Sequence, residues 1–187
     1  MIKLDKIYTR GGDKGKTSLG LGERVSKSNK IIIAIGSIEE LNAHLGIACQ
    51  GLEKKYAKII SDIQHDLFDL GADLAFTRKT NKKNLRITVE HTLRLENKID
   101  EINNILSPLK SFVLPGGTIG SSRLHLARTV CRRCEINIIN LSKVSKINGE
   151  IKKYINRLSD LLFVLARVIN GKGKKEILWK PGKNIQT

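Results

Sequence analysis

The chain has 187 residues, which favours one domain and is long enough to bury a core. Its net charge of +16 suggests nucleic-acid binding, but the lysines are spread along the chain, without a zinc-finger, helix-turn-helix or RNA-binding aromatic pattern. No apolar run of membrane-spanning length or signal-peptide core is evident, and three cysteines, an odd number, favour free thiols, so we expect a cytoplasmic protein with no membrane partner.

The first element, residues 8–18, has the composition of a loop that binds an anion. It holds three glycines, three cations and three Thr or Ser hydroxyls. Glycine lets backbone N–H groups approach an anion closely, so the segment indicates a polyphosphate ligand. Its end, Gly15-Lys16-Thr17, resembles a P-loop, but Arg10 stands where that motif needs its first glycine. A flexible turn without a ligand is the alternative for this segment taken alone.

Apolar residues at helical spacing predict five helices in the rest of the chain. The first three helices are expected at about 29–52, 54–76 and 88–106, before a loop rich in proline and glycine. Thr88 is the expected N-cap of the third helix. The loop is expected at 107–120, and the last two helices at about 121–141 and 150–170, with Gly171 as the stop.

Five long helices with short connections and little strand pattern predict an all-α fold, a ferritin-like five-helix bundle of the up-and-down type. We expect a single domain made of an extended N-terminal nucleotide-binding segment, the bundle and a C-terminal tail, at 1–28, 29–171 and 172–187.

The fourth helix carries an unusual polar face. Arg128, Arg132 and Glu135 stand at i, i+4 and i+7 and so share one side of the helix. Arginine suits bidentate contact with phosphate or carboxylate. A solvated basic stripe with a Glu–Arg pair is the alternative.

Polar residues also interrupt the apolar pattern of two other helices. Asn156 and Asp160 share a face of the fifth helix, which indicates either a ligand contact or a satisfied polar pair. In the first helix, Glu39 and Glu40 can pair with the arginines of the fourth, within one chain or across an interface. The three cysteines lack the spacing of a zinc site, so we expect them to be small core or interface residues.

Five blocks, taken in order, resemble the PduO-type ATP:corrinoid adenosyltransferases: residues 8–18, 36–42, 112–117, 128–135 and 154–160. The resemblance implies a homotrimer with active sites between neighbouring subunits. It implies transfer of the 5′-deoxyadenosyl group from ATP, accompanied by Mg²⁺, to the cobalt of a cob(I)alamin-type corrinoid, with triphosphate as the by-product. A flavin reductase and a cobalamin-dependent acceptor enzyme are the protein partners it suggests. The alternatives are a non-catalytic ATP- or corrinoid-binding chaperone and a basic helical nucleic-acid-binding protein.

The resemblance also assigns roles to individual residues. Arg128 matches an arginine that pairs with an acidic residue of the neighbouring subunit, at the position of Glu39, and Phe112 matches the aromatic residue under the corrin ring that helps expel the lower axial ligand. The ATP contacts match Thr9, Arg10, Gly11, Gly12, Thr17, Ser18, Lys27, Arg132, Arg133, Glu135 and Asn156. Two positions depart from the family, since Glu39 replaces the usual aspartate and Gly11 a more usual threonine.

Overall fold

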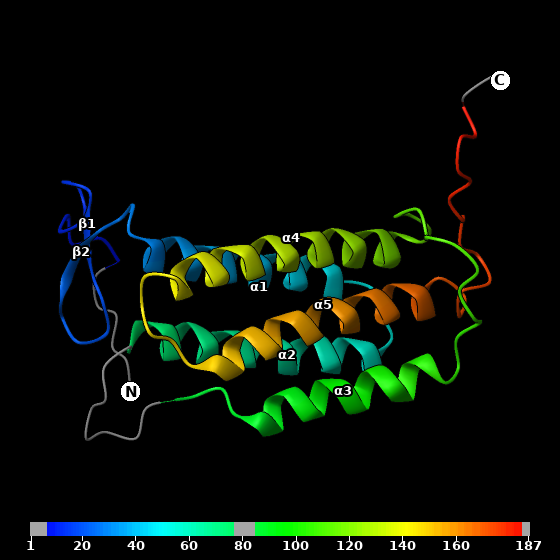
Figure 1. Cartoon of the computed structure of the whole chain (residues 1–187), viewed down its shortest axis with the longest axis horizontal. Helices are drawn as coiled ribbons and strands as arrows, with labels where there is room; N and C mark the ends of the chain where they lie inside the picture. Colours follow the sequence, from blue (N-terminus) through cyan, green and yellow to red (C-terminus); the bar gives the residue numbers. More distant parts are fainter. Residues whose placement is uncertain (1–6, 77–84, 185–187) are drawn as a thin grey trace.

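The fold is a bundle of five helices, seen in a computed structural model that describes residues 7–76 and 85–184. Figure 1 shows the helices side by side along the long axis: α1 (Lys30–Cys49), α2 (Lys54–Ala75), α3 (Val89–Asn103), α4 (Ile119–Ser142) and α5 (Gly149–Ile169). The packed pairs are α1 with α2 and α4, and α5 with α3 and α4. The predicted all-α bundle is confirmed. Residues 1–6 and 185–187 of the expected terminal segments lie outside the described residues.

Side-chain caps explain where the helices begin. Asn29 and Asn148 accept backbone N–H groups at the starts of α1 and α5, at 3.0 and 3.1 Å. Thr88 caps α3, as predicted, through a capping box with His91. The predicted start of α4 at residue 121 is wrong, because the Thr118 side chain accepts the Ser121 N–H at 3.2 Å and the helix begins at Ile119.

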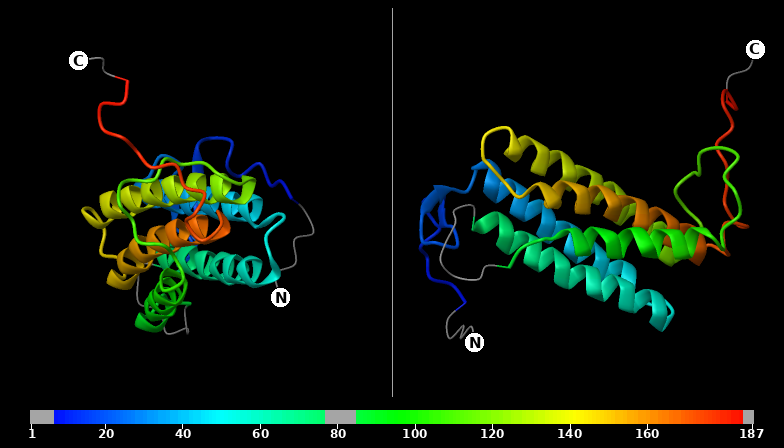
Figure 2. Two further views of the ribbon diagram at one scale, coloured as in Figure 1. Left: turned by 90° about the vertical axis from the view of Figure 1, so that its right-hand side faces the viewer. Right: turned by 60° about the horizontal axis from the view of Figure 1, so that its bottom comes forward.

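The core between the helices is built from leucine and isoleucine. The fully buried side chains of the helices come from α1, α2, α4 and α5 and include Leu41, Leu45, Ile60, Leu67 and Leu158. Each such side chain contributes about 1.5–3 kcal/mol relative to an exposed one. The two additional views in Figure 2 show α3 lying along the edge of the bundle. The core is therefore centred on α1, α2, α4 and α5.

A buried carboxylate joins three elements at one end of the bundle. The Asp73 side chain, 0% exposed, accepts from the guanidinium of Arg86 at 2.8 Å and the N–H of Ile87 at 3.0 Å. Asn148, the N-cap of α5, donates to it at 2.7 Å. Asp73 thus fixes the end of α2 to the entry of α3 and the start of α5.

A small hairpin, which the sequence analysis did not predict, precedes the bundle within the extended N-terminal segment. Strand β1 (Lys16–Ser18) pairs antiparallel with β2 (Arg24–Ser26), with Thr17 opposite Val25. Figure 1 places the hairpin at the end of the bundle where α1 begins. The C-terminal tail after Gly171 also pairs with the loop before α4, because Val113 and Leu178 form an antiparallel bridge.

Helix α1 is apolar and 20 residues long, enough to span a membrane by length and composition alone. This corrects the expectation that the chain contains no such run. In the structure the helix packs against α2 and α4, with Ile38, Leu41 and Leu45 in the core.

Candidate functional site

The loop before β1 has the tight backbone that its glycines predict. Arg10 and Gly15 adopt positive φ, at 58° and 73°. The N–H groups of Asp13 and Gly15 donate to the carbonyls of Arg10 and Gly12 at 3.3 and 3.1 Å. A non-glycine residue such as Arg10 rarely adopts this conformation, and strained backbone of this kind clusters at ligand-binding sites.

Lys27 returns to this loop from the far side of the hairpin. Its N–H donates to the Gly15 carbonyl at 2.8 Å. A Cβ added to Gly12 would lie 2.9 Å from the Lys27 ammonium, so this ammonium lies directly against the loop backbone. The structure therefore brings together Gly12, Gly15 and Lys27, as a polyphosphate site requires.

Sequence reasoning missed Arg24, which organises the same loop. Its guanidinium donates to the carbonyls of Gly11 and Lys16 at 2.6 and 3.4 Å and to the Ser18 hydroxyl at 3.4 Å. The only sequence signal is one arginine among nearby lysines. Lys16 and Thr17 lie on β1, and no helix follows them directly, so the P-loop alternative is excluded.

The two arginines on the polar face of α4 have different surroundings. Arg128 is half-buried, with its guanidinium 5.2 Å from the centroid of the Phe163 ring. Burial, followed by the charge of Arg132, lowers the pKa of Arg128 from its ordinary value. Arg132 is exposed and makes no hydrogen bond or ion pair with any residue in 7–76 or 85–184. The pair leaves two guanidinium groups available to an anion.

Glu135 and Asn156, which the resemblance assigns to ATP, contact each other in a polar network that extends across three helices. Asn156 donates to Glu135 at 3.0 Å, and Arg157 donates to Asn156 at 2.9 Å and to Glu96 of α3 at 2.7 Å. Asn156 is therefore part of a polar network within one chain, but its partners are Glu135 and Arg157 and not the predicted Asp160, which is exposed. The network fixes the carboxylate and amide beside Arg132 and leaves their remaining lone pairs and N–H groups for a ligand.

Only one of the two adjacent glutamates pairs with α4. Glu40 and Arg133 form an ion pair at 2.6 Å. Glu39 instead lines a groove of about 540 Å³ between α1 and α2, beside Phe68, whose ring is 74% exposed. No ion pair joins Glu39 to Arg128 within the described part of the chain.

The two halves of the predicted ATP site are separate in the single chain. Between residues 9–28 and helices α4 and α5, the described residues show no hydrogen bond or ion pair. Arg132 lies ten residues before Ser142, the end of α4, which is about 15 Å along the helix axis. The hairpin lies beyond that end (Figure 1).

Phe112 lies at the opposite end of the bundle, in the loop before α4. Its side chain is 77% exposed, and its ring meets the Trp179 ring edge-on, with the centroids 5.9 Å apart. An aromatic ring this exposed is available to a ligand, unlike a core residue.

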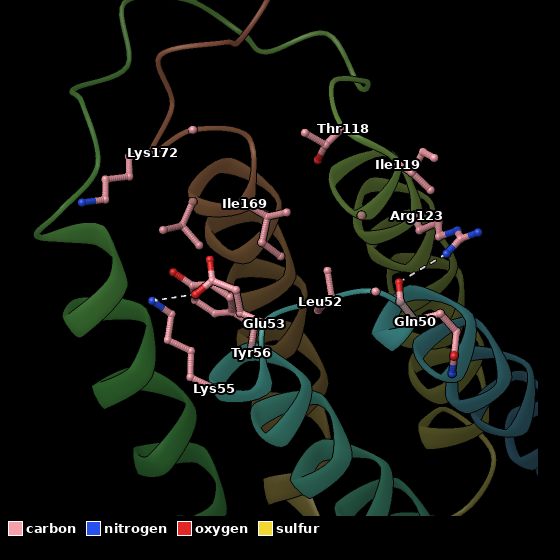
Figure 3. A pocket seen from close by; sticks show the side chains of 14 residues that line it. Gln50, Leu52, Glu53, Lys55, Tyr56, Thr118, Ile119, Arg123, Ile169 and Lys172 are labelled. Carbon is pink, nitrogen blue, oxygen red and sulfur yellow. Dashed lines mark hydrogen bonds and ion pairs between the residues drawn. The ribbon is translucent and has the colours of Figure 1, made fainter.

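A separate cavity of about 710 Å³ opens where α4 begins and α5 ends (Figure 3). Arg123 points toward the turn after α1, where its guanidinium donates to the Gln50 carbonyl at 3.5 Å. Lys55 and Glu53 form an ion pair on its other wall, at 3.2 Å. None of the site residues predicted from the sequence lines this cavity.

The cysteines have the structural role predicted for them. Cys131 and Cys134 are buried and Cys49 is half-buried, all as free thiols. Burial raises the pKa of Cys134 to about 11 and that of Cys131 well above its ordinary value. Within residues 7–76 and 85–184, no three His, Cys, Asp or Glu side chains gather as a metal site.

Comparison with known proteins gives a consistent result. Residues 7–169 match the profile of the family described as cobalamin adenosyltransferase. The chain is 41% identical to a cobalamin adenosyltransferase of Cupriavidus metallidurans, covering 95% of this chain and 96% of that one. It is 40% identical to a corrinoid adenosyltransferase of Bacillus subtilis, covering 89% and 88%.

Solved structures agree with the sequence matches. The fold resembles a variant of the PduO-type ATP:corrinoid adenosyltransferase from Lactobacillus reuteri, complexed with cobalamin and ATP. The TM-score is 0.88 at 34% identity, over 94% of this chain and 99% of the other.

Proposed function

Because this chain belongs to the cobalamin adenosyltransferase family, we propose that it transfers the 5′-deoxyadenosyl group of ATP to the cobalt of a reduced corrinoid. In this reaction, cobalt(I) of the corrinoid substrate supplies the electron pair for the new bond to C5′. The bond from C5′ to the triphosphate oxygen breaks, and its electron pair leaves on the triphosphate. Since the nucleophile belongs to the substrate, the protein must orient the two substrates and stabilise the leaving group.

The free guanidinium of Arg132 is the observation that supports this function most strongly. Among residues 7–76 and 85–184 it has no hydrogen-bond or ion-pair partner, and it lies next to the half-buried Arg128 and to the Glu135–Asn156 pair. We propose that Arg132 binds the triphosphate and that Asn156 and Glu135 contact the nucleoside, with Arg133 held by Glu40 nearby. The remaining triphosphate contacts come from the N-terminal loop: Thr9, Arg10, Gly11, Gly12, Thr17, Ser18 and Lys27.

The residues of the loop are compatible with Mg²⁺ carried by the ATP. Mg²⁺ usually keeps several waters and is held by substrate phosphates with one or two protein ligands. Asp13 is the one carboxylate of segment 8–18, and Thr17 and Ser18 supply hydroxyl oxygens. When bound, the ion would neutralise charge that develops on the departing triphosphate.

We assign the corrinoid contact to Phe112. Its exposed ring offers an apolar surface for the flat face of a corrin. Such a contact disfavours a polar axial base on the same face of the cobalt, which would ease reduction of cobalt(II) to cobalt(I).

A homotrimer with shared sites is the assembly we propose. Its support is that the loop does not reach Arg132 of its own chain, while Glu39 lines an open groove without an ion-pair partner among the described residues. Arg128 forms no ion pair in the same part of the chain, although the Asp160 carboxylate lies close enough to favour its charged form. Pairing Glu39 of one copy with Arg128 of the next would satisfy both charges and bring a loop to each Arg132.

A reductase, such as a flavin reductase, must supply cobalt(I), and a cobalamin-dependent enzyme must accept the product. We propose both as partners from the chemistry alone. The free thiols support a reducing, cytoplasmic compartment for this exchange.

The function is tested with purified protein, ATP, Mg²⁺ and chemically reduced cobalamin, following adenosylcobalamin by its visible absorption. Arg132→Ala is expected to lower kcat by about 10²–10³, the usual loss for a charge-stabilising donor. Lys98→Ala removes an exposed cation of α3 outside the site and serves as the matched control. If the wild type binds ATP but forms no adenosylcobalamin, the chain is a binding protein and the proposal is wrong.

The shared site is tested by mixing two defective variants. One lacks Arg132, and the other carries Thr17→Ala and Lys27→Ala in the loop. Refolded together in equal amounts, they should recover about one quarter of the wild-type activity, because one site in four then receives an intact loop and an intact arginine from different chains. A site contained in one chain would recover nothing.

A further inference from the structure

The segment after Gly171 forms a two-stranded ribbon with the loop that carries Phe112. The Leu114 N–H donates to the Ile177 carbonyl at 2.8 Å, and the Trp179 N–H donates to the Phe112 carbonyl at 2.7 Å. The Ser111 hydroxyl donates to the Trp179 carbonyl at 2.9 Å. These three bonds fix the backbone of Phe112 against that of Trp179.

The aromatic side chains of this ribbon pack on one another outside the core. The rings of Phe112 and Trp179 lie at 60° with centroids 5.9 Å apart, an edge-to-face contact. Both remain exposed, at 77% and 45%, so the contact adds little to the hydrophobic core. Its main physical effect is to restrict the rotamers open to the Phe112 ring.

A single buried arginine attaches both strands of the ribbon to the bundle. Arg167 of α5 pairs with Glu176 at 2.7 Å, with side chains only 3% and 5% exposed. The same guanidinium donates to the Ser107 carbonyl at 2.7 Å, at the start of the Phe112 loop. The ribbon is therefore mounted on α5 before any ligand arrives.

We propose that Trp179 is a positioning residue that holds the Phe112 ring in the orientation that contacts the corrinoid. The inference rests on the proposed adenosyl transfer and on the role assigned to Phe112 there. Trp179 acts through Phe112, by limiting the ring motion that corrinoid binding would otherwise have to arrest.

Trp179 is the only tryptophan of the chain, so intrinsic fluorescence reports on this contact directly. In the protein without ligands, Phe112→Ala should shift the Trp179 emission to longer wavelength, because it exposes the indole to water. Phe68→Ala removes another exposed ring, on α2, and should leave the emission unchanged. If Phe112→Ala also leaves it unchanged, the two rings are not in contact in solution and the inference fails.

Kinetics then separate positioning from folding. Trp179→Leu should lower kcat/KM for cobalamin about fivefold to tenfold while the KM for ATP and the thermal midpoint stay as in the wild type. Trp179→Phe keeps an aromatic edge and should restore most of the loss. The absorption spectrum of bound cob(II)alamin should show a larger fraction with the lower axial base still attached in Trp179→Leu.

A double-mutant cycle provides the decisive comparison. If Trp179 acts through Phe112, the Phe112→Leu, Trp179→Leu double variant is no slower than Phe112→Leu alone. If the wild type forms adenosylcobalamin, additive losses in the double variant, or full activity in Trp179→Leu, would overturn the positioning role. A wild type that forms none would instead overturn the proposed function.

Discussion

The three glycines of the N-terminal loop have different physical roles. Gly15 has φ of +73°, which few other residues adopt, and a Cβ at Gly12 would press on the Lys27 ammonium at 2.9 Å. A Cβ at Gly11 would meet only the Thr9 hydroxyl, at an ordinary 3.6 Å. Gly11 is therefore the glycine that can be replaced without distorting the loop.

We expect Gly11→Thr to strengthen ATP binding, because it adds a hydroxyl to the loop at a position with room for a side chain. One added hydrogen bond to phosphate, at about 1 kcal/mol net, corresponds to a KM for ATP lowered about fivefold. Gly11→Ala adds the Cβ without the hydroxyl and controls for loop stiffening. An equal fall in KM in both variants would show that the hydroxyl makes no contact.

The burial of the three cysteines predicts which thiols react in the native protein. With Cys131 and Cys134 buried and their pKa values raised, neither supplies thiolate near neutral pH. An aromatic disulfide reagent should therefore modify one thiol rapidly in the native protein, the half-buried Cys49, and three after denaturation. Cys49→Ser should abolish the rapid phase, and rapid modification of a second thiol would contradict the burial of this pair.

Among the elements, α2, α3 and α5 are joined at one end by a single carboxylate. Asp73 accepts from a side chain or backbone of each neighbouring segment, including the Ile87 N–H and the Asn148 amide. Helix packing alone does not fix the ends of adjacent helices so closely. Asp73 therefore sets where α3 and α5 begin relative to α2.

Asp73→Ala should lower the free energy of unfolding by about 3 kcal/mol, because it leaves buried donors unpaired. Denaturant titration measures the loss. Asp62→Ala, which removes an exposed carboxylate paired with Lys58 on the same helix, is the matched control and should cost under about 1 kcal/mol. Equal losses in the two variants would show that the Asp73 bonds carry no net stability.

The sequence predicts an element well only where a pattern of neighbouring residues encodes it. The five helices are long and periodic, so their existence was predictable and their bounds nearly so. Strands β1 and β2 have three residues each, too few for a periodic pattern. The bridge between Val113 and Leu178 joins residues far apart in the chain and leaves no local signal.

For the whole molecule, folding is linked to pH through a histidine in the core. His125 is buried and forms an edge-to-face contact with Phe163, with the ring centroids 6.2 Å apart. Burial, and then the charge of Arg128, lower the pKa of His125, while Glu176 acts weakly in the opposite direction. The unfolded chain therefore binds this proton at a pH where the folded chain does not.

It follows that the free energy of unfolding rises as the pH passes from the lowered pKa of His125 in the folded chain to the ordinary histidine pKa of about 6.5, and that this contribution is constant above it. His125→Leu removes the proton-binding group but keeps an apolar side chain. Denaturant titrations at several pH values should show a smaller slope in this variant than in the wild type. Equal slopes would mean that folding does not change the pKa of His125.

The candidate site was predictable as a set of residues but not as an arrangement. The sequence blocks, taken in order, predict Arg132, Asn156 and the loop as candidate site residues. The ion pair of Glu40 with Arg133 is one of the pairings that the sequence left open. The roles of Arg24 and Trp179 depend on contacts through space that no local pattern encodes.

Arg132 lies about 15 Å along α4 from the helix end that faces the hairpin (Figure 1), and its separation from the loop has a consequence for mass action. If a neighbouring chain completes each site, catalysis requires association, and the specific activity depends on protein concentration. Dilution below the dissociation constant of the assembly would then lower the turnover per chain, and ATP, by bridging two chains, would shift that constant toward association. The total activity in the cell would then rise more than proportionally with the amount of this protein.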